Sequence, residues 1–133
     1  MRQLEPRSAR RWRPYNRFTV LAQGERYFPV MLGAIERARE AVALETYWMS
    51  SGRVCARFID ALARAAGRGV AVQVLIDDYG SAGLSDADCR RLADSGVVLA
   101  RYNPLRLRRG RSNLERDHRK LLLVDADFAF VGG

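Results

Sequence analysis

One short run of apolar residues, VAVQVLI at positions 70–76, limits the folds open to this chain. It is nearly continuous in β-branched and aliphatic side chains, a pattern typical of a strand covered on both faces in a parallel sheet. Residues 53–68 before it predict a helix, because apolar side chains recur there at three- and four-residue steps, and Gly67 and Gly69 end it. A buried strand that directly follows a helix favours an α/β fold.

The alternation of helix and strand continues through the chain. Residues 25–40 predict a helix with Pro29 in its first turn, and Ser85 can cap a further helix that ends at Gly96. Apolar and β-branched runs predict strands at residues 17–21, 41–48, 97–102, 120–124 and 128–131. The last two strands are expected to join around Ala126. We therefore expect an α/β sandwich with a mixed, largely parallel sheet flanked by helices.

Basic residues divide the chain into an arm and a domain. Residues 1–16 show no apolar period, so we expect a flexible basic arm there, one domain over residues 17–133, and a basic loop at 103–116. The net charge of +8 and the pI near 10.5 suit a polyanionic partner, either nucleic acid, an anionic membrane surface or a phosphorylated substrate. For the two arginine clusters, contact with the headgroups of an anionic membrane surface and solvated surface charge are equally good explanations. These clusters are Arg2, Arg7, Arg10, Arg11, Arg13 and Arg17, then Arg106, Arg108, Arg109, Arg111 and Arg116.

Cysteine spacing and hydropathy bear on the class of protein. Cys55 and Cys89 fall in separate predicted helices without CxxC spacing, so we interpret them as thiols rather than a disulfide or metal ligands. No apolar run reaches the roughly 20 residues of a membrane-spanning helix, and no apolar segment follows the basic N-terminus as in a secretory signal. We expect a cytoplasmic chain that contacts the inner face of the cell membrane peripherally.

The residues of the segment DHRKLLLVD, positions 117–125, carry the chemistry. His118 is the only histidine and Lys120 the only lysine of the chain, although Lys and Arg together number 23. On a strand, residues two positions apart face the same way, so the imidazole and the ammonium are expected to project together. A nucleophilic imidazole beside a compact cation suits displacement at phosphorus, with a phosphohistidine as intermediate.

Asp125, the last residue of this segment, lies an odd number of positions after both His118 and Lys120. On a straight strand an odd interval turns a side chain to the opposite face, so we do not expect Asp125 to orient His118. Anchoring the turn at Ala126 is the role that we expect for it.

The pattern H-x-K-x4-D, followed by Gly132 and Gly133, resembles the signature of the phospholipase D superfamily. Four stretches are also similar to the N-terminal half of bacterial cardiolipin synthases, and the type without N-terminal membrane spans, the B type, fits best. They are GERYFPVMLGAIERA at 24–38, LETY at 44–47, VLIDDYGS at 74–81 and R-x-HRK at 116–120, and the similarity covers residues 17–133.

This resemblance implies a phosphatidyl transferase of phospholipid biosynthesis that needs no metal or organic cofactor. Its donor would be a phospholipid such as phosphatidylglycerol, and its acceptor an alcohol. His118 would be the nucleophile, with an acid/base role as the alternative, and Lys120 would clamp the phosphate. Glu45 could face the site, although a structural role is the stronger expectation. Asp77 and Ser81 follow a strand end, where α/β sheets bind ligands, but Asp77 is more readily explained as a loop anchor.

Enzymes of this kind carry two such motifs, and this sequence holds one. We therefore expect an incomplete half, truncated just after its motif and inactive alone, that needs a second half in cis or by dimerisation. Loss of further strands would leave an open sheet edge near residues 128–131. Two alternatives stay open: a nuclease or phosphodiesterase of the same superfamily, and a non-catalytic basic module that binds anionic lipid or nucleic acid.

Overall fold

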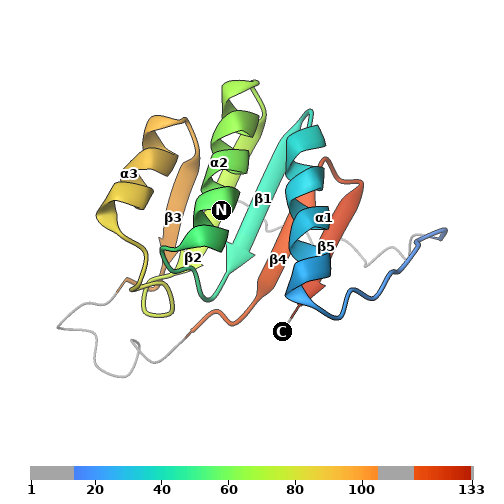
Figure 1. Ribbon diagram of the computed structural model, residues 1–133, viewed down its shortest axis with the longest axis horizontal. Coiled ribbons are helices and arrows are strands. Elements are labelled where there is room, and N and C mark those ends of the chain that lie inside the picture. Colours follow the sequence, from blue (N-terminus) through green and yellow to red (C-terminus); the bar gives the residue numbers. More distant parts are fainter. Residues whose placement is uncertain (1–13, 105–115, 133) are drawn as a thin grey trace, which may run out of the picture.

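The computed structural model describes residues 14–104 and 116–132, which form three helices and five strands (Figure 1). The helices are α1 (Gly24–Arg37), α2 (Arg53–Gly67) and α3 (Asp86–Asp94). The strands are β1 (Ala41–Thr46), β2 (Ala71–Asp77), β3 (Val98–Tyr102), β4 (Lys120–Val124) and β5 (Phe128–Gly132). Apart from the predicted strand at residues 17–21, every predicted helix and strand is present, with its ends shifted by a few residues.

The strands form one mixed sheet in the order β3-β2-β1-β4-β5. β1, β2 and β3 are parallel, whereas β4 pairs antiparallel with β1 and β5 antiparallel with β4. All three helices lie on one face of this sheet (Figure 1). The expected α/β class with a mixed, helix-flanked sheet is confirmed, and β3 and β5 are the outer strands of the described sheet.

The hydrophobic core lies between the sheet and the helices. Alternate strand residues face it, as Val42 and Leu44 do on β1 and Leu122 does on β4, while the middle of α2 contributes Ile59 and Leu62. Ser85 caps α3 as predicted, because its hydroxyl accepts a hydrogen bond of 3.2 Å from the Asp88 N–H. Both cysteines are free, and burial is the main cause that raises the pKa of the Cys55 thiol to about 11.

The strand predicted at residues 17–21 is wrong. These residues have no regular structure, and Phe18 and Val20 are each 91% exposed. An apolar, β-branched sequence becomes a strand only when a neighbouring strand fills its backbone hydrogen bonds, and none lies beside this segment in the described structure. The expected basic arm at 1–16 and the basic loop at 103–116 fall largely on residues 1–13 and 105–115, which lie outside the described residues.

Two smaller expectations also differ from the structure. β2 is covered on one face only, since Ala71 and Gln73 are exposed on the side away from the helices. Pro29 is the sixth residue of α1 rather than part of its first turn, because the helix begins at Gly24. Pro29 and Glu25 are exposed, so water can bind the carbonyl oxygen of Glu25 that the missing proline N–H leaves without a helical partner.

Asp125 anchors the β4–β5 turn against the start of β1. It and Ala126 have φ angles of 53° and 60°, in the left-handed region that reverses the chain. Its carboxylate accepts hydrogen bonds from three backbone N–H groups, those of Arg39 at 2.8 Å, Glu40 at 2.8 Å and Ala41 at 2.9 Å. The carboxylate thus holds residues far apart in the chain together, and it lies at the end of β4 remote from His118.

These three donors also lower the pKa of Asp125 below its ordinary value, with the N–H of Ala41 the largest cause. A lowered folded pKa contributes stability that is fully present above the unfolded value of about 3.9 and is lost as the pH falls through the folded value. We predict that Asp125→Asn is less stable than the wild type at pH 7 and that the difference shrinks below about pH 4. Urea unfolding at pH 7 and pH 3 measures this difference.

The matched control is Asp127→Asn, which removes the same charge from an exposed side chain in the same turn. It should leave the free energy of unfolding nearly unchanged at both pH values. An Asp125→Asn deficit that is equal at pH 7 and pH 3 would contradict the prediction.

Candidate active site

The His118-Lys120 motif leads into β4 at the carboxyl end of β1. The backbone N–H of Tyr47 donates to the carbonyl oxygen of Arg119 at 3.1 Å, and the pairing continues with Lys120 directly opposite Thr46. β4 begins where β1 ends, since the two strands are antiparallel. The motif therefore lies at the edge where β1, β2 and β3 all end, which is where open α/β sheets bind ligands.

The two predicted catalytic side chains are both exposed at this edge. The imidazole of His118 stacks on the ring of Tyr47, with ring centroids 4.1 Å apart and planes inclined by 12°. The ammonium of Lys120 bends back along the chain and donates to the carbonyl oxygen of His118 at 3.4 Å. One aromatic ring therefore restricts the histidine, while the cation remains beside it and open to an anionic ligand.

Glu45, Asp117 and Arg119 form a charged cluster on the sheet face opposite to Lys120. Arg119 Nε lies 2.9 Å from Asp117 Oδ1 and 3.1 Å from Glu45 Oε1. Arg119 Nη2 also donates to Asp117 Oδ2 at 3.1 Å, so the guanidinium holds Asp117 through two nitrogens. Glu45 Oε1 is buried and has no hydrogen bond in the described structure, because its contact with Arg119 has the distance of an ion pair without the required direction.

This cluster separates the pKa values of its two carboxyl groups. The hydrogen bonds from Arg119 are the main cause that lowers the pKa of Asp117 to about 2. The pKa of Glu45 is raised, first because a protonated Glu45 can donate a hydrogen bond to the Asp117 carboxylate, and second because Glu45 is partly buried. Asp117 is thus the firmly ionised member of the pair, and Glu45 is the member that more readily holds a proton.

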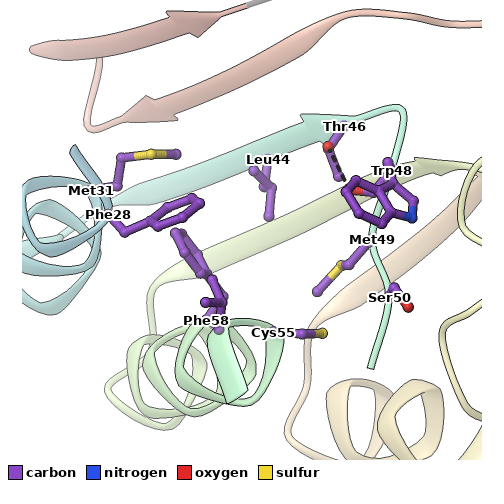
Figure 2. A pocket seen from close by; sticks show the side chains of 10 residues that line it. Phe28, Met31, Leu44, Thr46, Trp48, Met49, Ser50, Cys55 and Phe58 are labelled. Atoms are coloured by element: carbon purple, nitrogen blue, oxygen red, sulfur yellow. Dashed lines mark hydrogen bonds between the residues drawn. The ribbon is translucent and has the colours of Figure 1, made fainter. Parts of the chain in front are cut away.

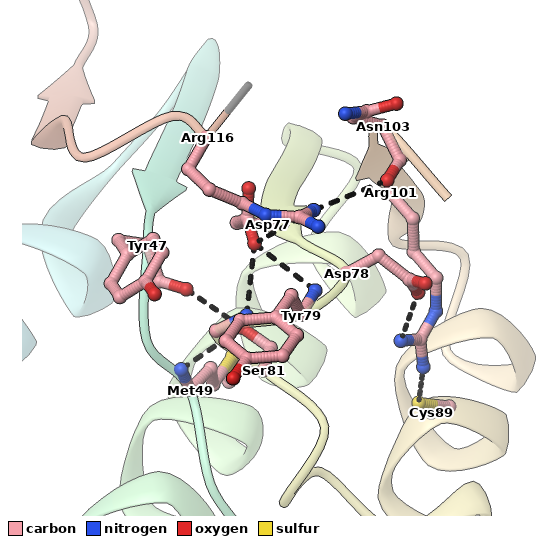
Figure 3. A network of polar contacts seen from close by, with 11 residues as sticks. Tyr47, Met49, Asp77, Asp78, Tyr79, Ser81, Cys89, Arg101, Asn103 and Arg116 are labelled. Carbon is pink, nitrogen blue, oxygen red and sulfur yellow. Dashed lines mark hydrogen bonds and ion pairs between the residues drawn. The ribbon is translucent and has the colours of Figure 1, made fainter. Parts of the chain in front are cut away.

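Asp77 connects the loop after β2 to the segment that leads to His118, and Figure 3 shows Asp77 beside Tyr79 of that loop and Arg116 of that segment. Its buried carboxylate accepts hydrogen bonds from the N–H groups of Tyr79 at 3.0 Å and Gly80 at 2.9 Å on one oxygen, and from that of Asp117 at 3.2 Å on the other. Arg116 Nη1 lies 3.8 Å from the first oxygen. These are the contacts of a loop anchor. One oxygen of Asp77 holds the loop after β2, and the other holds the backbone of Asp117, next to His118.

Ser81 joins the loops that follow β1 and β2. Its buried hydroxyl accepts a hydrogen bond from the Met49 N–H at 3.0 Å and donates to the carbonyl oxygen of Tyr47 at 3.2 Å (Figure 3). Gly80 beside it packs directly against Tyr47, since an added Cβ would lie 2.2 Å from the Tyr47 carbonyl oxygen. The position of Tyr47, and with it the support of the His118 ring, depends on this close approach.

The site therefore unites most of the predicted residues and adds others. His118, Lys120, Glu45 and Asp77 lie at the same sheet edge, whereas Asp125 lies at the far end of β4. Sequence reasoning missed Tyr47, Asp117, Arg116 and Arg119. The alternation of Asp117 and Arg119 with His118 and Lys120 could have indicated a charged pair on the opposite face. The stacking of Tyr47 on His118 had no comparable signal, because the register of β4 on β1 decides it.

Comparison with known proteins assigns the family. A family model described as "Cardiolipin synthase, PLD-like domain" matches residues 31–133. The chain belongs to this family. It is 42% identical over 124 residues to cardiolipin synthase B of Shigella flexneri, an alignment that covers 92% of this chain and 30% of the relative. The chain thus spans about a third of the length of the curated relatives that it matches, and the resemblance inferred from its motifs is confirmed.

Solved structures agree on the fold. Nuc from Salmonella typhimurium, a phospholipase D family member, matches with a TM-score of 0.51 and 25% identity over 73% of this chain and 56% of that chain. NucT from Helicobacter pylori matches with a TM-score of 0.57 over 78% of this chain and 63% of that chain, and its 18% identity shows a shared fold alone.

Two features bear on cofactors and membranes. Within residues 14–104 and 116–132, no group of three or more His, Cys, Asp and Glu side chains is placed to hold a metal ion. Over the same residues, none of the helices combines the length and the apolar character needed to span a membrane.

The close packing of Gly80 predicts a specific sensitivity. In Gly80→Ala the new Cβ would lie 2.2 Å from the Tyr47 carbonyl oxygen and 2.8 Å from ring atom Cε2, so one of the two loops must move. We expect a loss of about 1–3 kcal/mol in the free energy of unfolding, as for other overpacked sites. Gly67→Ala is the control, because its Cβ would meet nothing within 4 Å, and it should stay within about 0.5 kcal/mol of the wild type. Equal stabilities in urea would contradict the packing argument.

The stacking of Tyr47 on His118 can be tested separately by NMR. The chain has one histidine, so the Hε1 signal of His118 is assigned without ambiguity. Because the face of an aromatic ring shields protons above it, we predict that Tyr47→Leu moves this signal downfield. Tyr79→Leu, which changes a tyrosine of the next loop, should leave it in place. An unchanged His118 signal in Tyr47→Leu would mean that the two rings do not stack in solution.

Proposed function

We propose that this chain provides a phosphatidyl-transfer half-site of a cardiolipin synthase-type enzyme, with His118 as nucleophile and Lys120 as phosphate clamp. The observation that carries the proposal is the placement of the chain's only histidine and only lysine side by side at the carboxyl edge of the sheet, with His118 supported by Tyr47. Family membership supports phospholipid biosynthesis as the process. Phosphatidylglycerol or a similar phospholipid would be the donor.

In the proposed step, a nitrogen of the His118 imidazole attacks phosphorus. A P–N bond forms, the P–O bond to the leaving alcohol breaks, and the alcohol oxygen takes a proton from a general acid. Lys120 stabilises the negative charge that builds on the non-bridging oxygens. A second alcohol then attacks the phosphohistidine, so that a new P–O bond forms and the P–N bond to His118 breaks. The proton of this alcohol passes to the group that acted as general acid in the first step, which restores both that group and His118. No metal or organic cofactor enters this scheme.

The general acid is the part of this scheme that His118 cannot also supply. The imidazole nitrogen that attacks phosphorus must be unprotonated, so it carries no proton to give to the leaving oxygen, and the chain contains no second histidine. We propose that a second copy of the motif supplies this acid, in cis or from another subunit. Glu45, whose pKa is raised by its position beside Asp117 and by burial, lies at the same end of the sheet but on the face opposite to Lys120, so we do not assign the acid to it.

A donor with a good leaving group tests the nucleophile without the second motif. We predict that phosphatidyl-p-nitrophenol gives a burst of about one equivalent of p-nitrophenolate per chain, because this anion leaves without protonation. Mass spectrometry should then find one phosphatidyl group on His118. His118→Ala should abolish the burst, and the absence of any adduct on folded wild-type protein would contradict the proposal.

The phosphate clamp is tested by binding of the deacylated headgroup glycerophosphoglycerol. Lys120→Ala should raise the Kd for this headgroup roughly tenfold, because the variant loses one charge-assisted hydrogen bond to the phosphate. Arg90→Ala removes the same charge from an exposed position on α3 and should change the Kd less than twofold. A similar loss in both variants would mean that only the general positive charge matters.

A nuclease of the same superfamily is the alternative. The identity of 42% to a cardiolipin synthase, against 25% to Nuc, favours the lipid substrate. We further propose that the chain works at the inner face of the cell membrane, because its net charge of +8 favours anionic headgroups. Hydrolysis of DNA by the wild type, with no labelling by lipid, would favour the nuclease instead.

A further inference from the structure

An apolar cavity opens at the carboxyl end of β1, on the face of the sheet that the helices cover (Figure 2). Its volume is about 390 Å³, within the range of roughly 300–1,000 Å³ that small-molecule sites occupy. α1, β1, the β1–α2 connection and α2 all contribute walls. The main apolar walls are Phe28, Met31, Leu44, Trp48, Met49 and Phe58.

The polar groups of this cavity are already used within the protein. The Thr46 hydroxyl donates to the carbonyl oxygen of Trp48 at 3.3 Å, and the Ser50 hydroxyl donates to that of Gly83 at 3.4 Å. The other lining side chains are hydrocarbon, sulfur-containing or aromatic. The cavity therefore offers dispersion contacts and exclusion of water, and it suits a flexible apolar ligand rather than a sugar or a nucleotide.

The cavity and the proposed phosphate clamp are adjacent. Thr46, which lines the cavity, is directly opposite Lys120 in the β1–β4 pairing. Residues directly opposite in an antiparallel pair project from the same face, with Cβ atoms about 4.5–5.5 Å apart. A ligand whose phosphate contacts Lys120 can therefore extend an apolar chain past Thr46 into the cavity without crossing the sheet.

Two exposed side chains leave the cavity accessible. Trp48 is 70% exposed although it lines the cavity, and Val54 at the start of α2 is 43% exposed. An exposed tryptophan beside an apolar opening is typical of surfaces that contact the boundary between lipid headgroups and acyl chains. Entry from a membrane surface would need no movement of the core.

We propose that this cavity binds one acyl chain of the phospholipid whose phosphate contacts Lys120. The inference rests on the proposed function, which it extends from the headgroup to the chain. It makes the acyl chain a source of affinity and orientation, because a chain held beside Thr46 positions the phosphate next to Lys120. The test must distinguish this proposal from two alternatives: that another segment of this protein fills the cavity, and that the cavity binds no ligand.

The test measures how affinity depends on chain length. Calorimetry would give Kd values of the 133-residue chain for glycerophosphoglycerol, dibutyryl- and dihexanoyl-phosphatidylglycerol, all below their critical micelle concentrations. Each buried methylene strengthens binding by roughly fourfold, and one hexanoyl chain has two more methylenes than a butyryl chain, so the dihexanoyl lipid should bind about fifteenfold more tightly than the dibutyryl lipid. Val54→Glu, which places a charge at the opening, should reduce this ratio to near one.

Val98→Glu is the matched control, since it adds the same charge at an exposed valine on β3, on the other face of the sheet. It should keep the wild-type ratio, and both variants should bind glycerophosphoglycerol with the same Kd. A ratio near one in the wild type, or a full ratio in Val54→Glu, would overturn the proposal. The first outcome would mean that no acyl chain enters the cavity, and the second that the chain binds elsewhere.

Crosslinking to the wild type tests the same point without a variant that could misfold. A phosphatidylglycerol with a diazirine at the end of one acyl chain should label Met31, Met49 or Phe58, and labels on the opposite sheet face would overturn the proposal. Lys120→Ala separates this inference from the proposed function. If Lys120→Ala leaves the Kd values for all three ligands unchanged, the proposed phosphate clamp is wrong. The chain-length ratio and the crosslinks would still show whether an acyl chain binds in the cavity.

Discussion

The antiparallel pairing of β4 with β1 is the constraint on which the rest of this structure depends. It brings residues 120–124 beside residues 42–46, although nearly 80 positions separate them in the chain. Leu122 and Val124 fix the register, because both must face the core beside Leu44 and Val42. A shift by one residue would expose these side chains and turn Lys120 to the opposite face of the sheet. The geometry of the motif is therefore a consequence of core packing.

Two carboxylates hold this pairing at its ends through backbone N–H groups. Asp125 binds three of them at the start of β1, and Asp77 binds that of Asp117 next to His118. Backbone donors have fixed positions, so a carboxylate that accepts from them determines the path of the chain more strictly than an exposed ion pair would. Asp125, the acidic residue of the H-x-K-x4-D pattern, thus stabilises the fold and lies far from His118.

The motif divides its residues between the two faces of the sheet. Lys120 shares its face with Thr46 and the apolar cavity, whereas Arg119 shares the other with Glu45 and Asp117. Tyr47, at the end of β1, supports His118 by stacking, and Ser81 and Gly80 hold Tyr47 from the neighbouring loop. An exposed histidine can be oriented in this way because the loop after β2 packs closely against the tyrosine that supports it. The chemistry that we propose relies on this support.

The sequence by itself determined the class of fold and the order of nearly all elements, and it indicated the two residues at the centre of the candidate site. Periodicity and capping are local properties, as in α2 and at Ser85, and the single histidine and lysine two positions apart on a strand are a local pattern too. Only the tertiary structure decided which strands are neighbours, that residues 17–21 lack one, and that Tyr47, Asp117 and Arg119 surround the motif. It also placed an apolar cavity beside Lys120. These features depend on strand register and loop packing between residues far apart in the chain, which no local pattern specifies.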